Sequence, residues 1–127
     1  MTVMEEDMIY WYDDLYMDQP VRREEEKCRR TIEKRSFWQK LPWKRNYYII
    51  MLANNRENLF EIMNTSEMFF RYYGYTDIYI IGVSRHYAGA VEMFRRIMTE
   101  GYRKDVGFDP RQLFLRERFQ PGKTVRR

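Results

Sequence analysis

Hydrophobic residues near the start of the chain recur at the spacing of an α-helix. On a helical wheel the apolar side chains share one face and most carboxylates share the other. The apolar face holds Met4, Met8, Trp11, Tyr12, Leu15 and Tyr16, and the acidic face holds Glu6, Asp7, Asp13 and Asp14. After Pro20, residues 21–40 have few apolar positions and acid–base pairs four residues apart, such as Glu25 and Arg29. The pattern predicts an N-terminal helical arm over residues 1–40.

Two short apolar runs farther along have the composition of strands buried on both faces. They read "NYYIIMLA" and "TDIYIIGV" and predict strands near residues 47–52 and 77–83. Each run precedes apolar residues spaced three and four apart, which predict helices near 57–73 and 85–100 that end at Gly74 and Gly101. The order strand, helix, strand, helix predicts a parallel pair of strands joined by a right-handed crossover.

The C-terminal part predicts one more strand. The run "RQLFLRERF" over residues 111–119 alternates enough for an edge strand, and Arg116 and Arg118 indicate that one of its faces is wet. Residues 119–127 are expected to form a disordered basic tail. The expected fold class is therefore α/β, with a domain over residues 41–118 that follows the helical arm. This domain is a small βαβαβ, Rossmann-like unit with a parallel or mixed three-stranded sheet.

Composition places these elements in one small domain. The chain has 127 residues, of which 44% are hydrophobic and 33% charged, enough for a single core. No apolar run approaches the roughly 18 to 20 residues that cross a bilayer, so we expect no membrane-spanning role. The N-terminal segment is acidic and Cys28 is the single cysteine, which predicts a cytoplasmic protein without internal disulfides.

The aromatic content indicates an interaction partner. Aromatic residues make up 17% of the chain. Two helices on one side of a small sheet leave its other side to the helical arm or to a partner. We therefore expect a homo-oligomer or a complex with another protein. The favoured function is a non-enzymatic protein-interaction or regulatory module that self-associates.

The charge distribution indicates an alternative function, that of a nucleic-acid-binding accessory protein. The first nineteen residues carry six acids and no lysine or arginine, whereas residues 20–45 carry ten bases and four acids. Basic and aromatic side chains are interleaved over residues 22–48 and could contact phosphates and stack on bases. The two oppositely charged segments could also neutralise each other in a folded helical hairpin.

The corners that follow the two predicted parallel strands suggest a third function, the binding of a small anion such as phosphate or a nucleotide. The carboxyl ends of parallel strands meet at one edge of a sheet, so polar groups there converge. These groups are Asn54, Asn55 and Arg56 after the first strand and Ser84, Arg85 and His86 after the second. Asn55 and Ser84 are also ordinary helix caps, which is the structural interpretation of the same residues.

No motif indicates catalysis, a metal ion or a cofactor. The run "GVSRHYAG" lacks the second glycine of a dinucleotide-binding loop, and no acid is placed by spacing to orient His86 beside Ser84. One histidine without cysteine or carboxylate partners does not predict a metal site. Basic neighbours could stabilise a Cys28 thiolate, but without a resolving cysteine we interpret Cys28 as a small helix residue. We expect no cofactor and lean against an enzyme.

Overall fold

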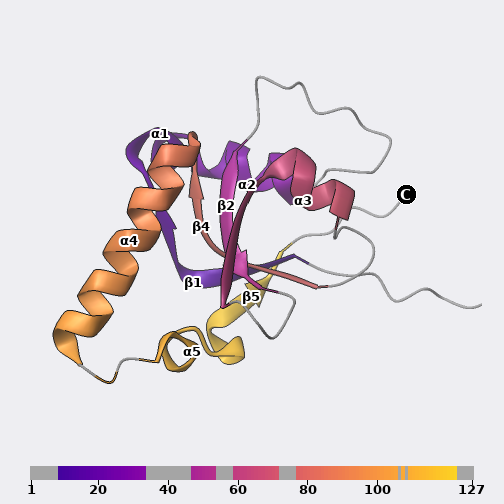
Figure 1. Cartoon of the computed structure of the whole chain (residues 1–127). Coiled ribbons are helices and arrows are strands. Elements are labelled where there is room, and N and C mark those ends of the chain that lie inside the picture. Colours follow the sequence, from indigo (N-terminus) through magenta and orange to yellow (C-terminus); the bar gives the residue numbers. More distant parts are fainter. Residues whose placement is uncertain are drawn as a thin grey trace, which may run out of the picture.

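A mixed five-stranded sheet, in the order β3-β2-β4-β1-β5, organises the structure (Figure 1). The computed structural model describes residues 9–33, 47–53, 59–71, 77–105, 107 and 109–122. The strands are β1 (Ile9–Met17), β2 (Tyr48–Leu52), β3 (Phe60–Asn64), β4 (Ile78–Ser84) and β5 (Phe119–Pro121). The helices are α1 (Gln19–Arg23), α2 (Glu25–Glu33), α3 (Thr65–Arg71), α4 (Tyr87–Lys104) and α5 (Pro110–Leu113). The α/β fold class is confirmed, but the sheet has five strands instead of three and is not a closed barrel.

The helix predicted for the first residues is wrong, because Ile9–Met17 form strand β1. This strand pairs in parallel with β4 and antiparallel with β5. Trp11 and Leu15 enter the core on one side of the sheet, and Tyr12 enters the core on the other. A strand covered on both faces needs no alternation, so its apolar residues can imitate helical spacing. The helical arm is confirmed only at α1 and α2, which follow β1.

The strands predicted near residues 47–52 and 77–83 are confirmed as β2 and β4, but they run antiparallel instead of parallel. After β2 the chain returns as β3 in a hairpin, in which the Ala53 amide donates a hydrogen bond to the Leu59 carbonyl at 3.0 Å. The helix expected from residue 57 therefore begins only at Thr65. Apolar residues of β3 contact both cores, so their spacing resembles that of the helix that follows. The expected cap, Gly74, lies outside the described residues.

Helix α4 confirms the helix predicted near residues 85–100, and it continues past Gly101 to Lys104. No helix in the described part of the chain has the length and apolar character needed to span a membrane.

The edge strand predicted over residues 111–119 occurs later, as β5, which pairs with β1. Pro110 instead opens the short helix α5, where its fixed φ suits a first turn, and a 3₁₀ turn follows at Arg116–Arg118. The tail expected to be disordered from residue 119 therefore contributes β5 to the sheet, and residues 123–127 lie outside the described ranges.

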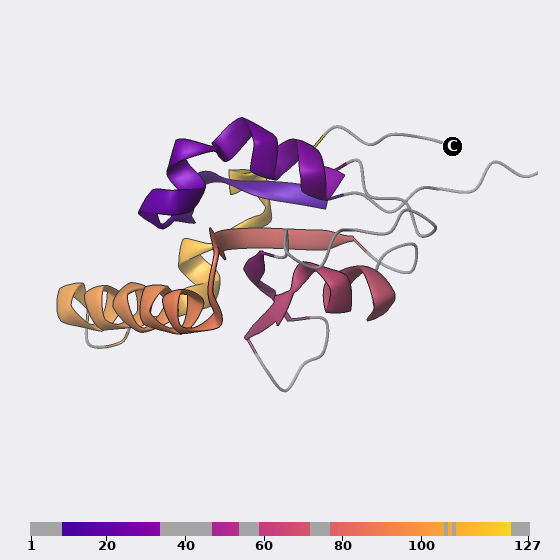
Figure 2. The same ribbon diagram turned by 90° about the horizontal axis from the view of Figure 1, so that it is seen from above.

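The sheet separates two hydrophobic cores. The first core, which α1, α2 and α3 help to form, contains Ile9, Trp11, Leu15, Val21, Cys28, Ile32, Tyr47, Ile49, Met51, Met63, Met68, Ile78, Ile80 and Val83. The second core, which α4 and α5 help to form, contains Tyr12, Ile50, Ile81, Ala90, Met93, Ile97, Phe114 and Phe119. Figure 2 shows α1 and α2 above β1 and α4 on the other side of β4. The central strands β1 and β4 are therefore buried from both sides.

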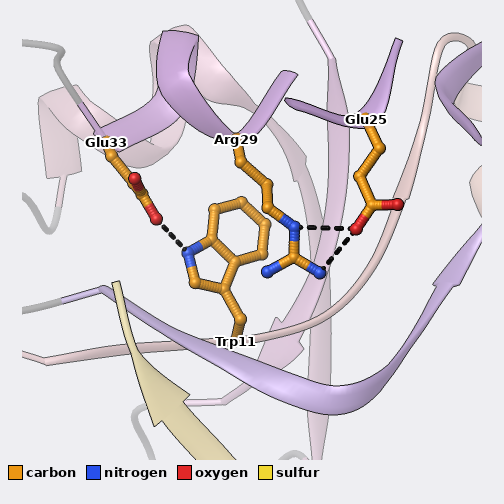
Figure 3. Close-up of polar contacts among 4 residues, drawn as sticks. All are labelled: Trp11, Glu25, Arg29 and Glu33. Atoms are coloured by element: carbon orange, nitrogen blue, oxygen red, sulfur yellow. Dashed lines mark hydrogen bonds and ion pairs between the residues drawn. The ribbon is translucent and has the colours of Figure 1, made fainter. Parts of the chain in front are cut away.

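Trp11 fixes the position of α2 on β1 (Figure 3). Its side chain is 2% exposed, and the indole N–H donates a hydrogen bond to Glu33 Oε2 at 2.7 Å. The Arg29 guanidinium lies over the ring, 4.8 Å from its centroid, and forms an ion pair with Glu25 at 2.9 Å. Glu25, Arg29 and Glu33 are four residues apart and so share one face of α2. The indole thus meets an acceptor and a cation that sit on one helix face.

Replacing Glu33 by alanine is expected to lower the free energy of unfolding by about 1–3 kcal/mol, because the buried indole N–H loses its acceptor. Glu33→Gln keeps an oxygen acceptor and is expected to lower it less. Glu26, an exposed residue of the same helix, provides the control, and Glu26→Ala is expected to change stability by about 0.5 kcal/mol or less. Urea denaturation followed by circular dichroism measures all three; equal losses for the two alanine variants would contradict this role of Glu33.

Candidate functional site

The carboxyl ends of β1 and β4 define the candidate site. The two strands are parallel neighbours, with Met17 paired with Val83 near their ends. Helix α1 follows β1 and buries Val21 in the first core, whereas α4 follows β4 and buries Ala90 and Met93 in the second. Figure 1 shows α1 and the first turn of α4 at the same end of the sheet. The two helices therefore leave neighbouring parallel strands toward opposite faces.

Asp18 joins these two corners. Its Oδ1 accepts a hydrogen bond from the Val21 amide at 3.2 Å and caps α1. Its Oδ2 accepts hydrogen bonds from the Ser84 hydroxyl at 2.5 Å and from the Arg85 amide at 3.3 Å. The Ser84 oxygen in turn accepts a hydrogen bond from the His86 amide at 3.2 Å. One carboxylate thus ties the start of α1 to the turn between β4 and α4.

Two glycines let α4 lie close to this joint. A Cβ atom on Gly89 would lie 2.3 Å from Ser84 Oγ and 3.3 Å from Asp18 Oδ2. The buried Ser84 side chain cannot turn away without losing its hydrogen bond to Asp18. A Cβ atom on Gly82 would lie 2.8 Å from Met93 Sδ. A larger residue at Gly89 would therefore push α4 away from the joint, and one at Gly82 would force the Met93 side chain to move.

A crevice of about 390 Å³ lies between β1, α1 and α4. Its lining residues are Asp14, Leu15, Tyr16, Met17, Asp18, Arg22, Gly89, Glu92, Met93 and Arg96. The α4 residues among them are three and four positions apart and form one helix face. Leu15 and Met93 are buried, whereas Asp14, Arg22, Glu92 and Arg96 are exposed. The crevice thus has apolar groups within and charged groups of both signs at its mouth.

The β1 side of the crevice has an irregular backbone. The register of β1 against β4 shifts between Trp11 and Tyr16, and such bulges redirect side chains and recur beside binding sites. Burial raises the pKa of Tyr16, and the carboxylates of Asp14 and Glu100 raise it further. The phenol therefore stays protonated at neutral pH and can donate a hydrogen bond.

Of the six residues predicted to hold an anion, Asn54, Asn55 and Arg56 lie outside the described residues, so their convergence with the other three stays a prediction. Ser84, the last residue of β4, is paired with Tyr48 at the start of β2, because these two strands are antiparallel. Ser84 ends β4 and does not cap α4. The N-cap residue is His86, whose exposed side chain makes no capping hydrogen bond.

Arg85 extends on the side of the first core. Its guanidinium carbon lies 5.2 Å from the centroid of the Tyr47 ring, and its buried Nη1 has no hydrogen-bond partner among the described residues. The Tyr47 hydroxyl donates to Glu24 at 3.3 Å, and burial raises the pKa of Tyr47 to about 12. Burial also raises the pKa of Cys28 to about 12, so its thiol stays protonated. Cys28 is thus a core residue of α2, as interpreted from the sequence, and not a stabilised thiolate.

Two aromatic residues of the nucleic-acid hypothesis are engaged inside the protein. Tyr47 is fully buried, and the Tyr48 ring meets the Tyr87 ring edge to face at 5.8 Å. Phe37, Trp38 and Trp43 lie outside the described residues. Tyr47 is therefore not available for base stacking, whereas Tyr48 is half-buried against Tyr87.

The site has no recognisable catalytic or metal-binding constellation in the described part of the chain. No group of three or more histidine, cysteine or acidic side chains there could hold a metal ion. The hydrogen bond that His86 gives to Ser84 comes from its backbone amide, not from the imidazole. A serine, histidine and acid in the order required for a nucleophile are therefore not assembled at this corner.

The residues of β1 and α1 were missed as site residues because the first segment was interpreted as a helix. A signal for them exists in the sequence. The run "IYWYDDLYM" is rich in residues that favour strands, and the sequence Asp18–Gln19–Pro20 that follows is typical of a helix start, with a capping acid and a proline in the first turn.

Gly89→Ala is expected to lower the free energy of unfolding by about 1–3 kcal/mol, because the new methyl group overlaps Ser84 Oγ and strains its bond to Asp18. Gly101→Ala, in the same helix, is the matched control. It is expected to raise stability by about 0.5–1 kcal/mol through helix propensity alone. Thermal and urea unfolding measure both variants, and stabilisation by Gly89→Ala would show that α4 does not approach the joint this closely.

Comparison with models of protein families, with curated proteins and with solved structures found no match, so the chain is assigned here to no family.

Proposed function

We propose that the protein binds a small polar molecule, without transforming it, in the crevice between β1, α1 and α4. The observation that carries this proposal is the position of the crevice at the carboxyl ends of two parallel strands whose helices leave toward opposite faces. Ligands of open α/β sheets bind at such a switch point, and in this respect the proposed site is Rossmann-like.

The lining supports a polar ligand of modest size. A volume of about 390 Å³ is at the lower end of what small-molecule sites use. Buried apolar groups can exclude water from part of the ligand, while the charged groups and the Tyr16 hydroxyl can orient it. Acid–base catalysis favours a group with a pKa near neutrality, whereas the lining of the crevice includes no histidine or cysteine and burial raises the pKa of the Tyr16 phenol. We therefore propose binding and not turnover.

Titration with a set of small acids, amines, sugars, nucleotides and amino acids tests this proposal. At least one compound is expected to bind saturably and to shift the amide resonances of residues 14–18 and 89–96. Met17→Trp enlarges a residue of the crevice lining and is expected to abolish the shifts, whereas Leu115→Trp, at an exposed position outside the lining, is expected to leave them unchanged. Shifts confined to other residues, or retained in Met17→Trp with a native circular dichroism spectrum, would refute the proposed site.

Self-association is a second candidate function, favoured by an exposed apolar stripe on α4. Tyr87, Val91 and Tyr102 are 56%, 36% and 50% exposed. Together with the partly buried Phe94 and Met98 they recur at three- and four-residue spacing. At about 100° per residue the stripe and the crevice-lining residues lie on opposite flanks of the buried face of α4. We propose that this stripe packs against α4 of a second copy of the chain.

The double variant Val91→Lys, Tyr102→Lys is expected to convert a dimer into a monomer, because it places charges in an apolar contact. Leu115→Lys, which changes an exposed leucine outside α4, is the control and is expected to leave the dimer intact. Sedimentation velocity over a range of concentrations measures the state of each. A monomer for the unmodified protein at every concentration would rule out this candidate.

A further inference from the structure

We infer that the crevice binds a zwitterion of the amino-acid class, with its carboxylate held by Arg22 and Arg96 and its ammonium by Asp14 and Glu92. This inference rests on the proposed function, because it requires the crevice to be a small-molecule site. It adds the chemistry of the ligand, which follows from the way the lining charges are paired.

On the α4 side, one arginine is engaged and its neighbour is not. Glu92 precedes Arg95 by three residues and Arg96 by four, so both guanidiniums are within its reach. Glu92 Oε1 accepts hydrogen bonds from Arg95 Nε at 3.3 Å and from Arg95 Nη2 at 3.2 Å. Arg95 does not line the crevice, whereas Arg96 does, and among the described residues the Arg96 side chain has no hydrogen-bond or ion-pair partner. The Arg96 guanidinium and the second carboxylate oxygen of Glu92 are thus available to a ligand in the crevice.

The β1 side repeats this pattern with the opposite sign. Asp13 accepts hydrogen bonds from Arg118 Nε at 2.8 Å and from Arg118 Nη2 at 2.6 Å. Asp14, the next residue, lines the crevice, and its carboxylate has no hydrogen-bond or ion-pair partner within the described ranges; the same holds for the Arg22 side chain. The Asp18 carboxylate is already occupied by its three donors. The groups left to a ligand are therefore of both signs.

Ligands of a single sign do not match this lining. The crevice is lined by three carboxylates, Asp14, Asp18 and Glu92, and by two guanidiniums. A polyanion such as a nucleotide would meet carboxylates on both walls, and a polyamine would meet both guanidiniums. A zwitterion satisfies both kinds of group, since arginine forms bidentate bonds with a carboxylate and carboxylates accept from an ammonium.

The spacing of the charges suits an α-amino acid. Glu92 and Arg96 are one turn apart on one helix face, with their Cβ atoms about 5–6 Å apart. An α-amino acid carries its ammonium and its carboxylate on a single carbon, so both charges can face such a pair. Leu15, Met17 and Met93 line the same crevice and offer apolar contacts to the rest of the ligand.

Calorimetry and amide chemical shifts on the full chain, with each of the twenty standard L-amino acids as probe, test the inference. At least one is expected to bind saturably with shifts at residues 14–18 and 89–96. The amine and the acid that each lack one charged group of that amino acid are expected to bind about tenfold more weakly or worse, because each leaves lining charges unpaired. Arg96→Ala and Asp14→Asn are expected to weaken binding of the amino acid to a similar degree. Arg103→Ala and Arg23→Ala, which change exposed arginines of α4 and α1 outside the lining, are expected to leave it unchanged.

The outcomes separate this inference from the proposed function. Binding of inorganic phosphate or of a simple amine at the crevice, without binding of any amino acid, overturns the zwitterion and leaves a small-molecule site. The absence of binding there by every compound tested overturns both. Arg96→Gln, which keeps a polar side chain and a good helix former, is the second variant if Arg96→Ala lowers the melting temperature. Equal affinities of folded Arg96→Gln and Arg103→Ala for the bound amino acid would overturn the assignment of Arg96.

Discussion

The hydrogen bonds to the Asp18 carboxylate are the interaction on which the candidate site depends. They connect the β1–α1 corner with the β4–α4 corner, whose residues Asp18 and Ser84 are 66 positions apart in the sequence. Ser84 is fully buried, and Asp18 is one of two acceptors within reach of its hydroxyl, the other being the His86 carbonyl at 3.0 Å. Because α1 and α4 leave from this joint toward different cores, the space between them stays open along one side of β1. The crevice thus depends on the hydrogen bonds by which Asp18 connects the β1–α1 corner to the β4–α4 corner.

Burial of the central strands from both sides supports the same arrangement. Trp11 contacts α2 on one face of β1. On the other face, the Tyr12 ring contacts the rings of Phe114 and Phe119 at centroid distances of 4.9 Å and 5.4 Å. Among the described residues, many of the aromatic side chains that suggested a surface for a partner are therefore used inside the protein. The exposed aromatic side chains of this part of the chain, Tyr87 and Tyr102, lie on α4 in the stripe apart from the crevice.

The elements predicted best from the sequence are those whose hydrophobic pattern fits only one type of secondary structure. Helix α4 has one apolar stripe toward the sheet and is bounded by polar turns, and β2 and β4 are continuous apolar runs between charged or polar segments. The prediction failed at β1 and β3, where burial on both faces gives spacings that also fit a helix. Strand direction could not be predicted either, because it depends on whether the chain returns after Ala53 through a helix or through a hairpin. The Ser84 corner was recognised as polar, but its partner Asp18 could not be, since that contact joins residues far apart in the chain.

The position of β1 has a consequence for the order of folding. Its first residue, Ile9, is paired with Ile78, so the parallel pairing closes a loop of most of the chain. The β2–β3 hairpin, by contrast, joins strands that lie close together in the sequence and can form early. During synthesis β1 is made long before β4, so its apolar residues at first lack the strand that later pairs with them. Helices α1 and α2 follow β1 directly in the chain and can cover one of its faces in the meantime. An interior strand of the finished sheet is thus among the last to be paired, and until then its apolar residues are open to aggregation.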